Sequence, residues 1–262
     1  PDQGTDHIGN LMFVSTDTEK LTHTLPLHVG FPTDVTDNAD HTKAYVAISR
    51  AGGSTDTGAN GGGGYSSIEI IDLATKQVTK SIQTSGNPYG LTNLALTSDG
   101  SKLYVTDRGA DSVIVIDTVT ESIVDTITGI AGGPIDIRLS ADDRYAYVYS
   151  RYTAAVHVID TQIDDIVDSI QLTTAAGNGS TALVMSHDGL RMYATSTLAG
   201  EIMLIDLDES SPTYRQQIQK ITTLAAGFYE LDISLDGRFM YATALYDDEL
   251  YVVDINTASA SY

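Results

Sequence analysis

Five copies of one short pattern run through the chain and constrain its fold more than any other feature. The best-defined copy is LYVTDRGADSVIVID at residues 103–117, and the frame recurs at 146–160, 192–206 and 240–254. A fifth copy opens at Ala44 and closes at Asp72, and it carries an insertion of 14 residues that is rich in glycine. Once the insertion is subtracted, the repeated tyrosines lie 43 to 48 residues apart: Tyr45, Tyr104, Tyr147, Tyr193 and Tyr241.

A period of this length, built only from β patterning, is typical of the four-stranded blades of a β-propeller. In each repeat a short strand leads into a tight turn such as Asp99-Gly100, and three further strands follow. Asp before Gly is a turn signal because Gly accepts positive φ and Asp hydrogen-bonds its own backbone nearby. We therefore expect an all-β chain whose four-stranded antiparallel sheets form about five to six propeller blades.

The repeats predict a single β-propeller domain over residues 1–262. Its expected parts are a partial blade at 11–27, full blades at 31–84, 88–127, 134–170 and 180–221, and a blade lacking its outer strand at 228–255. These parts sum to 21 strands, which is neither five nor six whole blades. This count favours a portion of a larger, seven-bladed ring, and the alternative is a five-bladed ring closed by residues 20–27.

The repeated residues also resemble a known family. YVT followed by a polar residue and Arg-Gly, then V-x-V-I-D and T-x-x-x-V-x-x-I, is similar to the repeat of the YVTN propeller proteins, and the resemblance covers nearly the whole chain. It implies a surface-layer-like or other exported protein, so we expect an extracellular or periplasmic location at the cell surface. Broader relatives resemble lactonases and the heavy subunits of quinone-cofactor amine dehydrogenases, which supplies an enzymatic alternative.

Composition narrows the classes of partner. With 262 residues, a net charge of −21 and a pI near 4.3, the chain lacks the clustered Lys and Arg that nucleic acids require. There is no apolar run long enough to span a membrane, and there is no cysteine. The start at Pro1, without a methionine or a signal-peptide region, fits a mature exported protein and a trimmed chain equally. We expect a neutral or cationic partner.

No catalytic, nucleotide-binding or metal motif stands out. The six histidines form no zinc-like pair, so we expect surface or turn roles for them. The Asp that ends the third strand of every repeat predicts a turn cap rather than a catalytic carboxylate. The cofactor is unknown from sequence; loose Ca²⁺ binding is conceivable at two acidic groups, namely Asp206, Asp208 and Glu209, and Asp247, Asp248 and Glu249.

The loops give the best candidates for binding. Links between repeats, and links between the second and third strands, lie on one face and gather aromatic and Arg residues, which are enriched at interfaces. The binding-face candidates are Arg50, Arg108, Arg151, Tyr89, Tyr152, Asn178, Tyr229 and Tyr246. We expect a binding or scaffolding module that contacts a protein or a glycan through this face and assembles with other chains. The acidic turns of the opposite face predict solubilising charge.

Two finer expectations concern that face. Arg50, Arg108 and Arg151 occupy one repeat position and predict a cationic strip; the alternative is that each pairs with a nearby carboxylate such as Asp111 or Asp136. The glycine-rich insertion between Ile48 and Ile68 predicts a projecting loop, because ordering such a segment costs much entropy. Its deletion should change the melting temperature by only about a few degrees.

Overall fold

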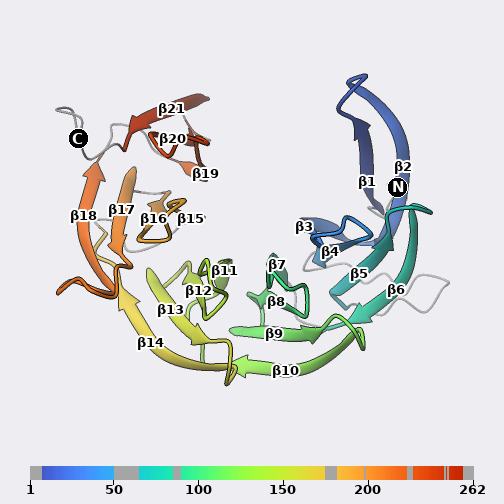
Figure 1. Cartoon of the computed structure of the whole chain (residues 1–262), viewed down its shortest axis with the longest axis horizontal. Coiled ribbons are helices and arrows are strands. Elements are labelled where there is room, and N and C mark those ends of the chain that lie inside the picture. Colours follow the sequence, from blue (N-terminus) through green and yellow to red (C-terminus); the bar gives the residue numbers. More distant parts are fainter. Residues whose placement is uncertain are drawn as a thin grey trace, which may run out of the picture. The chain divides into compact units, whose positions relative to one another are not determined.

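The computed structural model consists of strands and turns (Figure 1). It describes residues 8–49, 65–84, 90–174, 182–197, 199–222, 227–244, 246 and 248–255. These residues hold 21 strands and no helix, as the repeats predict. The chain divides into two compact units, unit 1 (Pro1–Thr128) and unit 2 (Gly129–Tyr262), and each is considered by itself.

Unit 1 contains a hairpin followed by two four-stranded sheets. The N-terminal hairpin pairs β1 (Ile8–Ser15) with β2 (Lys20–Val29). Sheet I contains β3 (Phe31–Asp37), β4 (Lys43–Ser49), β5 (Ser67–Asp72) and β6 (Gln77–Gln83). Sheet II contains β7 (Leu91–Leu96), β8 (Lys102–Asp107), β9 (Ser112–Asp117) and β10 (Ser122–Thr128).

Unit 2 contains three sheets of the same kind. Sheet III contains β11 (Pro134–Leu139), β12 (Tyr145–Ser150), β13 (Ala155–Asp160) and β14 (Asp165–Gln171). Sheet IV contains β15 (Leu183–Met185), β16 (Arg191–Ser196), β17 (Glu201–Asp206) and β18 (Gln216–Thr222). Sheet V has three strands, β19 (Phe228–Ile233), β20 (Phe239–Ala244) and β21 (Glu249–Asp254). In every sheet the strands pair antiparallel in chain order, and we call them strands A to D.

The repeated tyrosines occupy equivalent places, as the repeat frame predicts. Tyr104 lies opposite Val115, Tyr147 opposite Val158 and Tyr193 opposite Leu204, each in the pairing of strand B with strand C. Successive residues of strand C point to opposite faces of the sheet, and both faces are buried in sheets I, II and IV. These strands therefore read as continuous apolar runs rather than alternating ones.

Neighbouring sheets within a unit stack face to face, and the strand B tyrosine marks the direction. We call the face of a sheet that turns toward the next sheet in the chain its leading face, and the other its trailing face. In unit 2, Tyr193 and Leu204 on the leading face of sheet IV join one core with Leu231 and Met240 on the trailing face of sheet V. Tyr45 of sheet I meets sheet II in the same way. Burying one such large side chain fully contributes about 2 kcal/mol to the stability of the fold.

The turns between strands A and B repeat one hydrogen-bonded arrangement. In sheet II, Thr97 Oγ1 donates to Asp99 Oδ1 at 2.7 Å and accepts from the Lys102 N–H at 3.0 Å. Ser140 with Asp142, Ser186 with Asp188, and Ser234 with Asp236 make the same hydroxyl-to-carboxylate bond. The pKa of each of the four carboxyls lies below its usual value, mainly through the backbone N–H of Ser101 for Asp99 and mainly through the serine hydroxyl for the other three. Each of these acids closes a turn, as the turn signal predicts, and their role as solubilising charge stays a prediction.

The Asp that ends strand C caps the next turn, as predicted. Asp117 Oδ1 accepts from the backbone N–H of Thr120 at 2.7 Å and from its hydroxyl at 3.0 Å, and Asp72 does the same with Thr75. Hydrogen bonds from these threonines lower the pKa of both carboxyls. The last residue before strand D then takes positive φ, as Glu121 (φ 51) and Arg215 (φ 58) do. The C–D turns therefore present one side chain at a fixed angle.

Candidate functional site

The links between strands lie at two opposite ends of each sheet, where the strands begin and finish, and the two ends carry different residue types. We call the end with the D–A and B–C links the loop edge, and the end with the A–B and C–D turns the turn edge. The sequence places the binding candidates at the loop edge. The structure supplies geometry for five of them, whereas Arg50, Tyr89 and Asn178 lie outside the described residues. Most of the predicted insertion, residues 50–64, also lies outside them.

At the loop edge, strand A carries a bulge in several sheets. The pairing register shifts between Pro32 and Asp34 in sheet I, between Pro134 and Asp136 in sheet III, and between Phe228 and Glu230 in sheet V. A bulge leaves one extra residue unpaired and redirects its side chain. In sheet V that residue is Tyr229, which is 57% exposed.

Tyr246 lies close to the link that precedes this bulge. It is 63% exposed, and a Cβ at Gly227 (φ 88) would come within 2.7 Å of its ring. The glycine therefore lets the ring lie against the link backbone. Gly227 N–H donates to Thr197 O, and Thr197 Oγ1 donates to Phe228 O, both at 2.7 Å. These bonds tie the sheet V link to the B–C link of sheet IV.

The remaining described candidates lie on other sheets. Arg108 and Arg151 occupy equivalent backbone positions, since their N–H groups donate to Gly90 O at 2.9 Å and Gly133 O at 3.0 Å. Their side chains are half-buried, and they belong to different units, so the cationic strip stays a prediction. Tyr152, next to Arg151, is 52% exposed.

A charge cluster built on the buried Asp136 lies in unit 2, and the sequence did not predict it. Asp136 on β11 accepts from the N–H groups of Ile137 at 2.8 Å and Leu183 at 2.6 Å, and pairs with Arg138 at 2.8 Å. The Arg138 guanidinium also donates to Leu183 O at 3.1 Å and lies 4.0 Å from Glu230 on β19. The strand A residues of sheets III, IV and V are thereby connected. Arg138 already pairs with the Asp136 carboxylate, so Arg151 would have to compete with Arg138 to form the suggested pair.

Burial raises the pKa of Asp136 to about 6, against the opposing effect of Arg138 and the two N–H groups. Unit 1 holds a milder version of the contact: Asp34 on β3 accepts from the Leu94 N–H of sheet II at 2.8 Å and is only half-buried. Asp34 and Asp136 hold the same place in the repeat. Aligning strand A of the repeats would have drawn attention to this acid.

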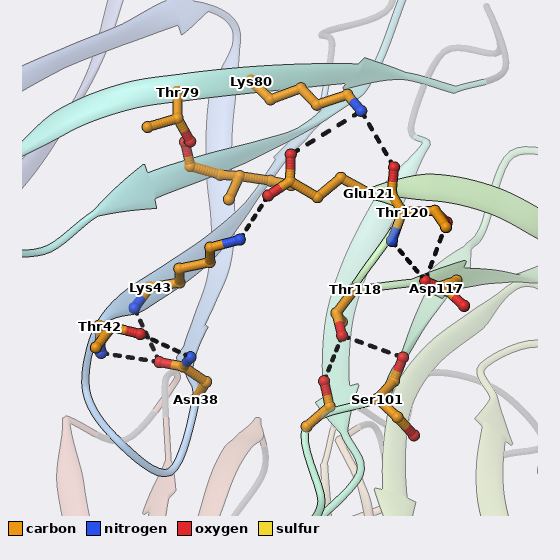
Figure 2. Close-up of polar contacts among 12 residues, drawn as sticks. Asn38, Thr42, Lys43, Thr79, Lys80, Ser101, Asp117, Thr118, Thr120 and Glu121 are labelled. Carbon is orange, nitrogen blue, oxygen red and sulfur yellow. Dashed lines mark hydrogen bonds and ion pairs between the residues drawn. The ribbon is translucent and has the colours of Figure 1, made fainter.

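At the turn edge of unit 1, one glutamate connects two sheets (Figure 2). Glu121, from the C–D turn of sheet II, lies 2.6 Å from Lys43 Nζ and 3.9 Å from Lys80 Nζ, both on sheet I. Lys80 also reaches the carbonyl of Thr120 at 3.5 Å. We call this arrangement the Glu121 clasp.

In unit 2, sheets III and IV make the equivalent contact, but a cation takes the place of the glutamate. Arg215 holds the place of Glu121, Tyr145 the place of Lys43, and Asp168 the place of Lys80. The guanidinium carbon lies 4.4 Å from the Tyr145 ring centre and 4.8 Å from that of Tyr214, and Nη1 lies 3.5 Å from Asp168. Nε and Nη2 are buried without a hydrogen-bond partner. We call this the Arg215 clasp.

An open groove of about 490 Å³ runs beside the Arg215 clasp, between β14 and β18. Its lining is polar and includes Gln171, Gln217 and Gln219. Gln217 Oε1 accepts from the N–H of Thr173 at 2.8 Å, and Gln171 Nε2 donates to the carbonyl of Thr153 at 2.8 Å. Two of its amides are thus already used to hold sheets and links together.

The acidic group suggested for Ca²⁺ is also occupied by internal bonds. Asp206 accepts from Thr213 Oγ1 at 2.6 Å and from the Asp208 N–H at 3.0 Å, and Asp208 accepts from Ser210. The second suggested group includes Asp247, which lies outside the described residues. Within the described ranges, no cluster of three His, Cys, Asp or Glu residues is arranged to hold a metal ion.

The histidines are only in part where the sequence suggested. His187 bonds a turn carbonyl, Ser234 O, at 2.9 Å, and exposed His41 pairs with Asp37. His157, however, lies half-buried within strand β13, and burial lowers its pKa. The expectation of a surface or turn role is wrong for His157, because its position in the repeat belongs to a core strand.

Compared with protein-family models and with curated proteins, the chain has no match. In the part of the chain that the structure describes, no helix is long and apolar enough to cross a membrane. The functional argument therefore depends on the geometry given above.

Proposed function

We propose that the chain is an extracytoplasmic β-propeller of the YVTN kind, that its sheets are the blades, and that it acts as a binding or scaffolding module. Its contact surface is the loop edge of sheet V, and its ligand is a basic segment of a partner protein. The exposed pair Tyr229 and Tyr246 carries this proposal.

The two tyrosines are suited to binding because Tyr229 belongs to a paired strand and Tyr246 lies against a hydrogen-bonded link. Tyr229 projects from a bulge, and Tyr246 lies against Gly227, whose link is hydrogen-bonded to sheet IV. Rigid aromatic side chains provide contact area at low cost in conformational entropy. A site of this kind loses little entropy when a ligand arrives.

The charge around the tyrosines selects the ligand class. Glu230, Asp248 and Glu249 are exposed on the same sheet, and the chain as a whole carries a net charge of −21. Carboxylates attract Lys and Arg at long range, and a tyrosine ring attracts a cation placed over its face. A basic peptide segment therefore fits this surface better than an anionic glycan does.

The enzymatic alternative has a candidate in Asp136, because carboxyls with raised pKa values are common in active sites. Both oxygens of Asp136 are already engaged by backbone N–H groups, and one also pairs with Arg138. The same acid recurs in unit 1 as a link between sheets. This repetition favours a structural role over a catalytic one.

Fluorescence anisotropy with a synthetic Lys- and Arg-rich peptide tests the proposal. Replacing Tyr229 and Tyr246 together by Ala should weaken binding about tenfold, since two cation–π contacts are lost. Tyr65→Ala is the matched control, because Tyr65 is 56% exposed but belongs to unit 1. Equal binding by all three proteins would reject the site. Binding of a neutral oligosaccharide that depends on the same tyrosines would replace the protein ligand by a glycan.

A further inference from the structure

The groove between β14 and β18 lies wholly within unit 2, with sheet III on one side and sheet IV on the other. Its volume of about 490 Å³ falls within the range of roughly 300–1,000 Å³ that sites for small molecules occupy. Its lining combines four glutamines with a serine, a threonine, a lysine, an arginine and two isoleucines. Among these described lining residues there is no carboxylate. The groove therefore offers mostly neutral hydrogen-bonding groups on a strongly acidic chain.

Gln217 in this groove departs from the pattern of the repeat. The other four-stranded sheets have an apolar residue at the same place of strand D, namely Val78, Ile123 and Ile166. Each of these pairs with the strand C residue that corresponds to Ile205, the partner of Gln217. The fold therefore does not require a glutamine at this place. A local departure from the pattern that the other copies follow is a sign of function.

The Gln217 side chain is held at one end and leaves its donors at the other. Its Oε1 accepts from the backbone N–H of Thr173 at 2.8 Å and from the Thr173 hydroxyl at 3.1 Å. A backbone N–H can only donate, so the atom it bonds is the oxygen, and Nε2 carries two N–H donors. In the part of the chain that the structure describes, Thr173 alone hydrogen-bonds this side chain. The groove thus contains a positioned amide whose donors are available to a ligand.

The two cations that line the groove are already paired. Lys220 Nζ lies 2.7 Å from Glu201, whose side chain is only 4% exposed, and Arg215 Nη1 lies 3.5 Å from Asp168. The Nε and Nη2 atoms of Arg215 are buried, so they cannot donate to a ligand in the groove. The net charge of −21 would in addition repel an anion. A neutral ligand therefore fits the groove better than an anionic one.

We propose that the groove between β14 and β18 binds a short neutral oligosaccharide, and that the Gln217 amide donates to a sugar hydroxyl. A sugar carries several hydroxyls, each able to donate and accept, and the amides and hydroxyls of the groove can do both. An extended peptide fits less well, because recognition of an added strand uses pockets for alternate side chains. The apolar part of the lining is limited to Ile170, which is buried, and Ile218.

The binding should be weak. The groove is open, and a sugar gives up hydrogen bonds to water when it binds, so the expected dissociation constant is on the order of millimolar. The residues of the groove are separate from Tyr229 and Tyr246 on sheet V. The inference therefore does not rest on the proposed function, and either can fail alone.

Saturation-transfer NMR titrations with four neutral probes test the inference: N-acetylchitotriose, cellotetraose, maltotetraose and mannotriose. At least one should bind the unchanged chain saturably. Gln217→Ile should weaken that binding at least about fivefold, because the amide donors are lost. The unfolding transition should stay in place, since sheets II and III carry isoleucine at this position. Gln77→Ile is the matched control, because Gln77 is exposed on strand D of sheet I in unit 1; this variant should bind as the unchanged chain does.

Three outcomes would overturn the inference. The first is that none of the four saccharides binds at concentrations up to about 10 mM, well above the expected dissociation constant. The second is equal weakening by Gln217→Ile and Gln77→Ile, which would place the sugar outside the groove. The third is that a synthetic peptide of alternating Thr and Val binds, depends on Gln217, and is not displaced by any of the saccharides. That result would assign the groove to an extended peptide.

Discussion

The Glu121 clasp and the Arg215 clasp occupy the same place in two pairs of stacked sheets, yet they hold those pairs by different forces. In unit 1 the contact joins a glutamate to two partly exposed lysines. In unit 2 an arginine with a side chain only 14% exposed lies against two tyrosine rings. The backbone fixes where a turn-edge side chain meets the neighbouring sheet, whereas its chemistry is free to change.

The same contrast holds for the acids of strand A. Asp34 bonds the next sheet while half-exposed, and Asp136 does so fully buried beside Arg138. The contacts compared here, the two clasps and the two strand A acids, are therefore less exposed to water, or drier, in unit 2 than in unit 1. Removing a partner from a dry contact costs more, because water cannot replace the lost bonds.

The largest expected effect is the loss of Asp136. Asp136→Ala leaves the N–H groups of Ile137 and Leu183 unpaired and takes the carboxylate away from Arg138. We expect unit 2 to lose about 3–4 kcal/mol of unfolding free energy at neutral pH in urea titrations. Asp34→Ala should cost about 1 kcal/mol. Equal losses for the two variants would contradict the difference in dryness.

The pH dependence gives an effect of nearly the same size. The folded-state pKa of Asp136 is raised to about 6, above its unfolded value near 4, so its protonated form stabilises the fold. That contribution is complete below about pH 4 and is lost as pH rises through 6, amounting to about 3 kcal/mol at most. Subtracting the stability of Asp136→Asn from that of the unchanged chain should give a difference that falls between pH 4 and pH 7. A flat difference would mean that the carboxyl titrates normally.

A smaller loss of unfolding free energy is expected when Arg215 of unit 2 is replaced. Arg215→Ala removes stacking on Tyr145 and Tyr214 and leaves space at the junction of sheets III and IV, at a cost of about 2 kcal/mol. This loss should be nearly the same in low and high salt. Arg238→Ala is the control, since Arg238 is half-exposed and pairs with Asp254 at 3.4 Å; it should cost less than about 1 kcal/mol.

The smallest effect sharpens the comparison from the other side. Glu121→Gln should cost unit 1 about 0.5–1 kcal/mol at low ionic strength, because its partners Lys43 and Lys80 are partly exposed. In about 1 M salt the cost should nearly vanish, since exposed charges are screened. Thermal melts of the variant and the unchanged chain at two salt concentrations measure this. A loss that persists in high salt would show that the Glu121 clasp is as dry as the Arg215 clasp.

The repeat predicted what depends on local pattern. The strand count, the equivalence of the tyrosines and the caps made by Asp72 and Asp117 follow from the repeated residue pattern and its turn chemistry, which the sequence displays directly. The contact of Arg138 with Glu230, and that of Arg215 with Tyr145, could not be found in this way. Both join residues far apart in sequence, and their chemistry is not repeated from sheet to sheet.

The loop-edge candidates show the same limit. Loop composition indicated Tyr229 and Tyr246, but the sequence does not reveal the bulge that redirects Tyr229 or the hydrogen bonds from Thr197 that hold the link. The proposed strip of arginines needs the relative positions of separate sheets, which no repeat pattern specifies. The small effect on the melting temperature expected from deleting the glycine-rich insertion also stays a prediction, because residues 50–64 lie outside the described residues.

The stacking direction also has a consequence for synthesis on the ribosome. In unit 2 the chain emerges with sheet III first, and its leading face, with Tyr147 and Val158, is covered only when sheet IV follows. At about 5–20 residues per second, a repeat of roughly 45 residues takes a few seconds to appear. During that interval the leading face of the newest sheet exposes its apolar side chains to water, and each new repeat covers one such face and exposes another.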